Sequence, residues 1–249
     1  MSKEYKECYV AFLDILGFKN LIMKEECGYI YDVFQRIRVG SQTQFKLNNE
    51  LVAAFSAVKH YVMSDSVVLY VEVSVKDSFF ALVRTCQILQ MSLLGMSSPI
   101  LLRGGITRGT IFSENEVIYG KGLVNAYLLE GSVADNPRII FTKQTLDDGR
   151  TNYDKIKPGI DSLAFYKDFD ELYSVNFMSL EFFSDFEFSA LYLDNILNFC
   201  QKNIDAETND RVRSKFLWLK KVALQLAKSK IGLLNLTDTG KTVVEKWNV

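Results

Sequence analysis

A short apolar run near the N-terminus ends at a carboxylate. Residues 8–13 are apolar and rich in residues that favour β-structure, and Asp14 follows directly. Gly17 then precedes a stretch of helical character over residues 18–48. The pattern predicts a buried strand, a tight turn and helices. Because a carboxylate at the exit of a buried strand is costly unless a cation meets it, the sequence indicates a cationic partner for Asp14, for which a hard metal ion is suitable.

A second carboxylate lies in a similar setting. The β-rich runs 57–64 and 66–73 flank Asp65, which predicts a β-hairpin with Asp65 at its tip. If these strands pair with the first strand, Asp14 and Asp65 come to one edge of the sheet. Two aspartates together with phosphate oxygens commonly hold Mg²⁺. Each aspartate alone is more typical of an ordinary turn or a helix N-cap, so the prediction of a metal site depends on the pair.

The segment after Asp14 is suited to phosphate. Gly17 gives the backbone conformational freedom, and Phe18 opens a helix, so that unpaired N–H groups could receive phosphate oxygens. Arg103 precedes Gly104 and Gly105, and it adds a fork of donors to a strand that a ligand or another backbone can approach closely.

The remaining elements predict an α+β fold, with helices packed on a mostly antiparallel sheet. A polar loop containing Asp147, Asp148 and Gly149 is expected before the last strand. The expected elements are a helix over 76–95, a strand over 100–108 broken by Gly104–Gly105, a strand or hairpin return over 109–118, a helix over 121–130, and strands over 139–141 and 163–166.

The composition changes beyond about residue 160. Two amphipathic helices are predicted over 188–203 and 208–230, and basic residues outnumber acidic ones from Phe188 onward. We predict a catalytic domain over residues 1–175 and a helical extension over 176–249 that packs on it. The basic surface is typical of a solvated face, and contact with an acidic partner or nucleic acid is the alternative.

Composition excludes several classes of protein. A hydrophobic share of 48 % and a charged share of 24 % indicate a globular chain, and the net charge of −1 provides no general attraction to nucleic acid or to anionic membranes. The four cysteines lack metal-ligand spacing and His60 is the single histidine, which disfavours zinc sites and Ser-His-Asp chemistry. The charged N-terminus and the absence of a long apolar run predict a cytoplasmic protein without a membrane span.

Four segments, in this order, resemble the catalytic domain of class III nucleotidyl cyclases. Residues 12–18 (FLDILGF) resemble the family's Phe-x-Asp-Ile-x-Gly-Phe, and Ser64-Asp65 resembles its Gly-Asp hairpin. Residues 103–109 (RGGITRG) resemble Arg-x-Gly-Ile-x-x-Gly, and residues 119–130 (YGKGLVNAYLLE) resemble in part the helix Gly-x-x-Val-Asn-x-Ala-x-Arg. The resemblance covers roughly residues 7–170 and implies the ferredoxin-like α+β fold of that family.

The resemblance also implies an activity and an assembly. It implies a head-to-tail homodimer with two symmetric interfacial sites, in which a nucleoside triphosphate is cyclised and pyrophosphate is released. Asp14 and Asp65 would bind two Mg²⁺ or Mn²⁺ ions with the Ile15 carbonyl, and Arg103 would contact the triphosphate. The implied site residues are Asp14, Asp65, Arg103 and Asn125 for catalysis, and Ile15, Leu16, Gly17, Phe18, Tyr61, Arg103 and Lys121 for substrate binding.

Two departures from the family pattern concern the base. Purine cyclases carry Lys or Glu four residues before the hairpin aspartate, where this chain has Tyr61. The second purine-reading aspartate has no counterpart at Val117 or Ile118. A phenol narrows the pocket, which favours a pyrimidine, although Tyr61 is also compatible with cross-strand aromatic packing in the dimer. The pattern resembles the pyrimidine cyclases of the bacterial Pycsar anti-phage systems, which implies UTP or CTP as substrate and a separate effector that reads the cyclic nucleotide.

A third departure concerns the transition state. The arginine of the fourth motif corresponds to Leu129, and Lys121 or Arg108 could supply the missing charge. Three hypotheses therefore stay open: a uridylate or cytidylate cyclase, a purine cyclase with an unusual base pocket, and an inactive cyclase-like module that senses a nucleotide.

Overall fold

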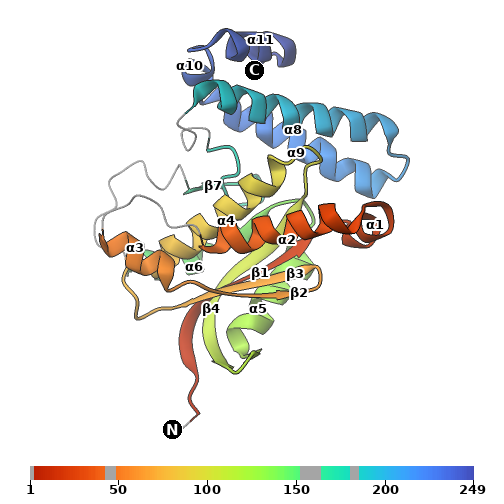
Figure 1. Ribbon diagram of the computed structural model, residues 1–249. Helices are drawn as coiled ribbons and strands as arrows, with labels where there is room; N and C mark the ends of the chain where they lie inside the picture. Colours follow the sequence, from red (N-terminus) through yellow and green to blue (C-terminus); the bar gives the residue numbers. More distant parts are fainter. Residues whose placement is uncertain (1–2, 43–48, 152–163, 180–184) are drawn as a thin grey trace. The chain divides into compact units, whose positions relative to one another are not determined.

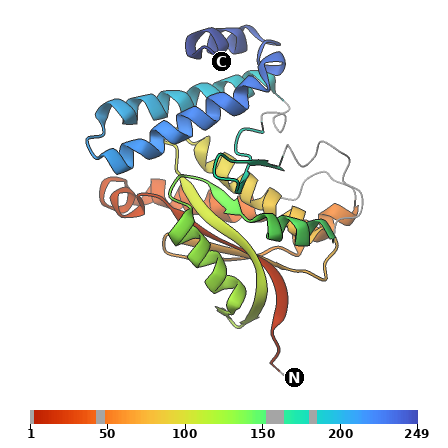
Figure 2. The same cartoon turned by 180° about the vertical axis from the view of Figure 1, so that it is seen from behind.

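The computed structural model describes residues 3–42, 49–151, 164–179 and 185–249, shown in Figures 1 and 2. The chain divides into two compact units. Unit 1 comprises Met1–Leu93 and Leu101–Asn176, and unit 2 comprises Leu94–Ile100 and Phe177–Val249. The functional assignment of residues 1–175 and 176–249, and the packing of one on the other, stays a prediction.

The described residues of unit 1 combine eight strands with helices, as expected for an α+β fold. Its strands are β1 (Lys6–Ile15), β2 (Lys59–Met63), β3 (Ser66–Glu72), β4 (Leu102–Glu114), β5 (Val117–Tyr119), β6 (Ile139–Phe141), β7 (Phe165–Lys167) and β8 (Tyr173–Val175). Its helices are α1 (Phe18–Lys24), α2 (Cys27–Gln42), α3 (Asn49–Ser56), α4 (Ser78–Leu94), α5 (Lys121–Val133) and α6 (Lys143–Thr151).

The sheet has the strand order β2-β3-β1-β4-β6-β8-β7, and β5 pairs with β4. Its pairs are antiparallel except for β4 with β6, which is parallel. The first predicted strand is therefore central, between β3 and β4. The predicted hairpin is also confirmed, since β2 and β3 are joined by the turn that contains Asp65.

The two faces of β1 carry different neighbours because successive side chains of a strand alternate. Tyr9 faces α4, where its ring lies 5.2 Å from the ring of Phe79. Phe12 faces α5, where its ring lies 5.3 Å from that of Tyr127. Figures 1 and 2 show α2 and α4 on one side of the sheet and α5 on the other. We call the side of the sheet that α5 covers the α5 face. Asp14 and Phe12 both lie on it.

Glycines in β4 allow α5 to lie close to the sheet. A Cβ atom on Gly105 would lie 2.7 Å from the Ala126 carbonyl oxygen, and one on Gly109 would lie 2.8 Å from the Gly122 backbone. The expectation that Gly104–Gly105 breaks the strand is wrong, because β4 runs unbroken from Leu102 to Glu114. These glycines serve the approach of another backbone, one of the two roles expected for them.

Other predictions were wrong in the second half of the chain. The expected polar loop contains α6, whose Thr145, Leu146 and Gly149 are buried. A Cβ atom on Gly149 would lie 2.4 Å from the Phe79 ring, so α6 lies directly against α4. The short strand β8 was not predicted. Part of the expected loop, including Pro158 and Gly159, and the start of the strand expected over 163–166 lie outside the described residues.

Unit 2 is helical, and the two predicted C-terminal helices are confirmed. They are α8 (Phe186–Ala206) and α9 (Asp210–Lys228), which begin at the side-chain caps Asp185 and Asn209. Two further helices, α10 (Ile231–Leu234) and α11 (Asp238–Trp247), were not predicted. Asp194 of α8 accepts hydrogen bonds from Lys246 and from the Trp247 indole, which fixes α11 on α8. In the described parts of both units, no helix is both long and apolar enough to cross a membrane.

Candidate functional site

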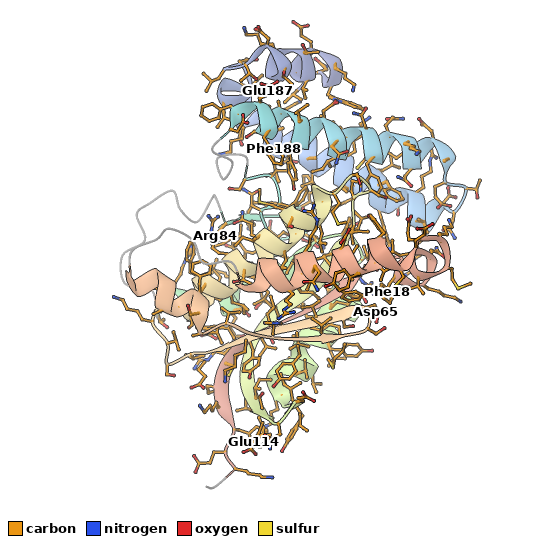
Figure 3. The ribbon with its side chains drawn as sticks, in the orientation of Figure 1. Phe18, Asp65, Arg84, Glu114, Glu187 and Phe188 are labelled. Atoms are coloured by element: carbon orange, nitrogen blue, oxygen red, sulfur yellow. The ribbon has the colours of Figure 1, made fainter. Side chains whose placement is uncertain are left out.

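The two predicted metal-binding aspartates lie at the same end of the sheet. Asp14 pairs with Ser66 in the β1–β3 register, and Asp65 precedes Ser66 in the hairpin turn. The Ile15 N–H donates to the Asp65 carbonyl oxygen over 2.9 Å, which ties the turn to the end of β1. Figure 3 labels Asp65 and Phe18 at this end of the sheet and Glu114 at the opposite end.

Arg103 lies between two carboxylates. It pairs with Asp14 in the β1–β4 register, and its Nε lies 3.3 Å from Asp14 Oδ2. The same Nε lies 2.5 Å from Oε1 of Glu130, whose side chain is 4 % exposed. Arg103 thus provides the cation that Asp14 was expected to need, and in this structure its charge is directed to carboxylates of its own chain.

Glu130 was given no role from the sequence. It lies on the buried stripe of α5 with Gly122 and Ala126, at a spacing of four residues that places all three on one helix face. An acidic residue on a buried helix stripe needs a cation, and this was the available signal. The identity of that cation depended on α5 crossing β4, which the sequence did not specify.

The donors at this end of the sheet fit a hard divalent cation. Asp14, Asp65 and the Ile15 carbonyl offer oxygen ligands, which Mg²⁺ and Mn²⁺ prefer. Among the described residues, no group of three or more His, Cys, Asp or Glu side chains is arranged to hold a metal ion. A cation here would therefore complete its shell with water or with substrate phosphates, as Mg²⁺ commonly does.

The segment predicted to bind phosphate forms a tight turn into α1. Gly17 has φ 76° and ψ 16°, a left-handed conformation that favours glycine. Leu16 donates its N–H to the Leu101 carbonyl oxygen over 2.9 Å, and Leu21 donates to the Gly17 carbonyl oxygen over 3.0 Å. The turn brings Ile15, Leu16, Gly17 and Phe18 to the end of the sheet that carries Asp14 and Asp65.

Tyr61 lies on the same face of the sheet as Asp14, further along the hairpin. It pairs with Val68, which in turn pairs with Phe12 on the α5 face. Its hydroxyl lies 2.7 Å from Ser113 Oγ, and its ring stacks at 6.2 Å on the ring of Tyr70. Tyr61 therefore packs across strands within its own chain and is hydrogen-bonded to β4, while the packing expected for it in a dimer stays a prediction.

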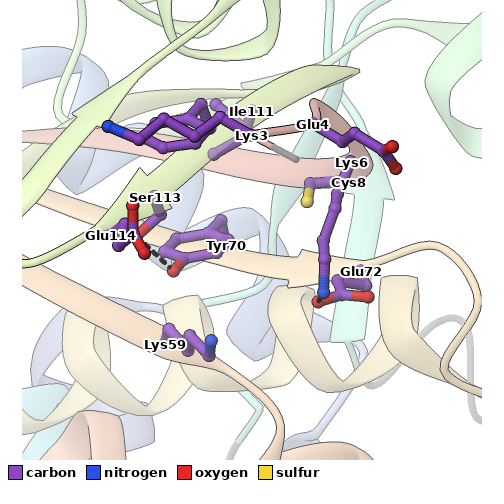
Figure 4. Close-up of a pocket in the computed structure, with 11 residues that line it drawn as sticks. Lys3, Glu4, Lys6, Cys8, Lys59, Tyr70, Glu72, Ile111, Ser113 and Glu114 are labelled. Carbon is purple, nitrogen blue, oxygen red and sulfur yellow. Dashed lines mark hydrogen bonds and ion pairs between the residues drawn. The ribbon is translucent and has the colours of Figure 1, made fainter. Parts of the chain in front are cut away.

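Next to these residues the same face of unit 1 is hollowed. A cavity of about 550 Å³ extends over the far end of β1, β3 and β4, and Figure 4 shows Lys59, Tyr70 and Ser113 among its lining residues. The Lys59 ammonium lies 5.9 Å from the centre of the Tyr70 ring, and Lys6 Nζ lies 2.5 Å from Glu72 Oε1. We refer to it as the Tyr70 cavity. It combines aromatic, hydroxyl and charged groups.

The two residues predicted on α5 lie apart from the aspartates. Lys121 is the first residue of α5 and is exposed. Asn125 lines a different cavity, of about 430 Å³, together with Arg108, Leu129 and Asp148. Asp14, Asp65 and Arg103 are not among the described residues that line it. One chain therefore groups the aspartates with Arg103 and places Asn125 elsewhere.

Solved structures supply the comparison with known proteins. The sequence matches no protein-family model and no curated protein sequence. The guanylyl cyclase domain of the RhoGC fusion protein from the aquatic fungus Blastocladiella emersonii aligns with 69 % of this chain and 95 % of its own, with a TM-score of 0.50 and 12 % identity. The chain has the fold of a nucleotidyl cyclase domain.

Other similar structures are also cyclases by name. An adenylate/guanylate cyclase/hydrolase from Silicibacter pomeroyi aligns over 70 % of this chain and 98 % of its own, with 16 % identity and a TM-score of 0.42. A bacterial light-regulated adenylyl cyclase aligns over 77 % and 99 %, with 15 % identity and a TM-score of 0.42.

Proposed function

We propose that this protein is a pyrimidine nucleotidyl cyclase that converts UTP or CTP to the 3′,5′-cyclic mononucleotide and pyrophosphate. The ribose 3′-oxygen forms a bond to the α-phosphorus, the bond from that phosphorus to the bridging oxygen of the β-phosphate breaks, and the 3′-hydroxyl proton is lost. The observation that carries the proposal is the juxtaposition of Asp14 and Asp65 at one end of the sheet, on a nucleotidyl cyclase fold.

The chain's own residues have distinct roles in this proposal. Asp14, Asp65 and the Ile15 carbonyl hold two Mg²⁺ or Mn²⁺ ions. When bound, such ions lower the pKa of the 3′-hydroxyl and neutralise charge on the α-phosphate. Gly17 and Phe18 position phosphate oxygens against the turn. Arg103 contacts the triphosphate, and Glu130 holds its guanidinium in place. Catalysis is then mainly positioning and charge stabilisation.

A homodimer accounts for the position of Asn125. Val124, Tyr127 and Leu128 of α5 are each 54 % exposed, an apolar surface that a second copy could cover. In a head-to-tail dimer Asn125, Lys121 and Tyr61 of one copy would act on the nucleotide held by the aspartates of the other. Tyr61 supports a pyrimidine because its ring fills space that a purine would need.

The proposal extends to a biological role. We propose an anti-phage second-messenger signal made in the cytoplasm and read by a separate effector, without nucleic-acid or membrane partners. This step depends on the resemblance to the Pycsar cyclases. Residues 176–249 are proposed as a helical extension of the catalytic domain.

The test is a competition assay on the full chain. Purified protein, Mn²⁺ and all four ribonucleoside triphosphates are incubated together, and the products are identified by mass spectrometry beside Asp65→Ala and Asp14→Ala variants. We expect a cyclic UMP or cyclic CMP peak that both variants lose. Cyclic AMP or cyclic GMP as the main product would instead support the purine cyclase. Unchanged activity in either variant would refute the metal-binding roles.

A second function is favoured by Leu129. This residue occupies the position of the transition-state arginine in the family motif, and an aliphatic side chain carries no charge for the α-phosphate. The alternative is a cyclase-like sensor that binds a nucleotide without converting it. Metal-dependent binding of UTP or CTP by a folded dimer, with no release of pyrophosphate, would support the sensor over the enzyme.

A further inference from the structure

Three hydroxyl groups from different strands meet beside the Tyr70 cavity. Tyr61 comes from β2, Tyr70 from β3 and Ser113 from β4, beyond the end of its ladder with β1. Ser113 Oγ lies 2.7 Å from the Tyr61 hydroxyl and 2.8 Å from the Tyr70 hydroxyl. Ser113 therefore joins the two stacked tyrosines, and Figure 4 shows it beside Tyr70.

The direction of these hydrogen bonds follows from the hydrogens available. The Tyr70 hydroxyl donates to Ser113 Oγ, and burial raises the pKa of Tyr70, so that it keeps this hydrogen. A serine hydroxyl has one hydrogen to donate. Among the described residues, the hydroxyl of Ser113 has only the two tyrosines as partners. Since Ser113 accepts from Tyr70, the hydroxyl hydrogen of Ser113 finds an acceptor if it is donated to Tyr61.

The resulting chain is Tyr70 to Ser113 to Tyr61. In this arrangement each donated bond strengthens the next, because a hydroxyl that accepts becomes a better donor. The reverse direction at Tyr61 would leave the Ser113 hydrogen without an acceptor in the described part of the protein. In this arrangement Tyr61 accepts from Ser113, and its own O–H hydrogen is available to a ligand.

We infer that Ser113 is a positioning residue for base selection: it fixes the Tyr61 hydroxyl as a hydrogen-bond donor, so that the site prefers UTP to CTP. The inference rests on the proposed function, in which Tyr61 faces the base. Uracil and cytosine differ along one edge of the ring. On that edge, the exocyclic group at position 4 projects furthest. Uracil presents an acceptor there, O4, whereas cytosine presents an amino donor that would oppose the Tyr61 hydrogen.

The experiment measures the ratio of products from equimolar UTP and CTP. The variants are Ser113→Ala, Ser113→Thr and Tyr70→Phe, with Ser214→Ala on the exposed part of α9 as the control. We expect cyclic UMP to predominate in the wild type. Ser113→Ala should lower the ratio of cyclic UMP to cyclic CMP about tenfold, the size of one hydrogen bond. Tyr70→Phe should lower it less, whereas Ser113→Thr and Ser214→Ala should keep it.

Calorimetric binding of non-hydrolysable UTP and CTP analogues separates this inference from the proposed function. A wild-type protein that cyclises neither nucleotide, but binds the UTP analogue preferentially and loses that preference in Ser113→Ala, would refute the cyclase and support the role of Ser113. An active wild type whose UTP-to-CTP ratio is unchanged in Ser113→Ala would overturn the inference alone, as would an active wild type that prefers CTP. Binding of neither analogue would overturn both.

Discussion

Nε of Arg103 lies 2.5 Å from Oε1 of Glu130, so a strand and the helix that crosses it are joined through a carboxylate with 4 % exposure. The same guanidinium also reaches Asp14 at 3.3 Å. Glu130 thus holds Arg103 beside a predicted metal ligand. In the proposed enzyme this pair would set where the Arg103 charge lies before the substrate binds.

Glu130→Gln is expected to destabilise unit 1. A neutral amide removes one carboxylate charge from the mostly buried ion pair with Arg103, and removing one partner of such a pair costs up to about 3–5 kcal/mol. Urea denaturation of the full chain measures the change. The control is Glu72→Gln, which removes an ion pair of the same 2.5 Å length with Lys6, whose side chain is 64 % exposed. The control should cost less than about 1 kcal/mol. Equal losses in the two variants would contradict the special role of burial at Glu130.

Gly105→Ala and Gly131→Ala should change stability in opposite directions. An added Cβ at Gly105 would lie 2.7 Å from the Ala126 carbonyl oxygen and 3.0 Å from the Glu130 nitrogen, so that α5 must move from the sheet. Overpacking of this kind costs roughly 1–3 kcal/mol. Gly131 lies in α5 with nothing within 4 Å of an added Cβ, and alanine there should stabilise the helix by about 0.5–1 kcal/mol. Thermal unfolding of both variants tests the pair, and a stabilised Gly105→Ala protein would show that α5 does not depend on this contact.

One of the four thiols should react rapidly in the native protein. Cys27 is exposed, whereas Cys8, Cys86 and Cys200 are buried. Burial raises the pKa of Cys8 to about 11 and that of Cys200 to about 12, and it also raises the pKa of Cys86. Because the thiolate is the reactive form, a colorimetric thiol reagent at pH 8 should modify one equivalent quickly and all four only after unfolding. Cys27→Ser should remove the rapid phase, and a rapid phase that persists would place a buried thiol within reach of solvent.

The pair of Arg138 and Asp170 should make stability depend on acid pH. Hydrogen bonds from Arg138, at 2.5 Å and 3.0 Å, lower the pKa of Asp170. A carboxylate with a lowered pKa adds stability above its ordinary pKa of about 3.9, and this contribution is lost as the pH falls through the lowered value. The wild type should therefore exceed Asp170→Asn at pH 7, by less than about 1 kcal/mol because the Asp170 side chain is 43 % exposed, and the difference should shrink below about pH 4. Urea denaturation at several pH values measures it, and a difference that stays constant down to pH 2 would exclude this linkage.

Local patterns in the sequence were sufficient for the central elements of unit 1. The apolar run before Asp14 and the hairpin around Asp65 predict their own strands, because side-chain alternation and turn residues act over a few positions. The left-handed turn at Gly17 follows from the same local rules. Together they indicated that two carboxylates would meet at one edge of the sheet, and the β1–β3 register places Asp14 beside the Asp65 turn.

Contacts between distant segments were decided only by the tertiary structure. The polar sequence of α6 predicted a loop, yet Leu146 and Gly149 are buried and Gly149 lies against Phe79 of α4, and this packing outweighs a weak local preference. Glu130 and Ser113 were given no role from the sequence, since each acquires its partner from another strand or helix: Arg103 for Glu130, and the two tyrosines for Ser113. The sequence by itself determined which strands and turns form. The tertiary structure decided which side chains meet between these elements. The close approach of α5 to Gly105 and Gly109 is one example, because such contacts depend on the packing of whole elements.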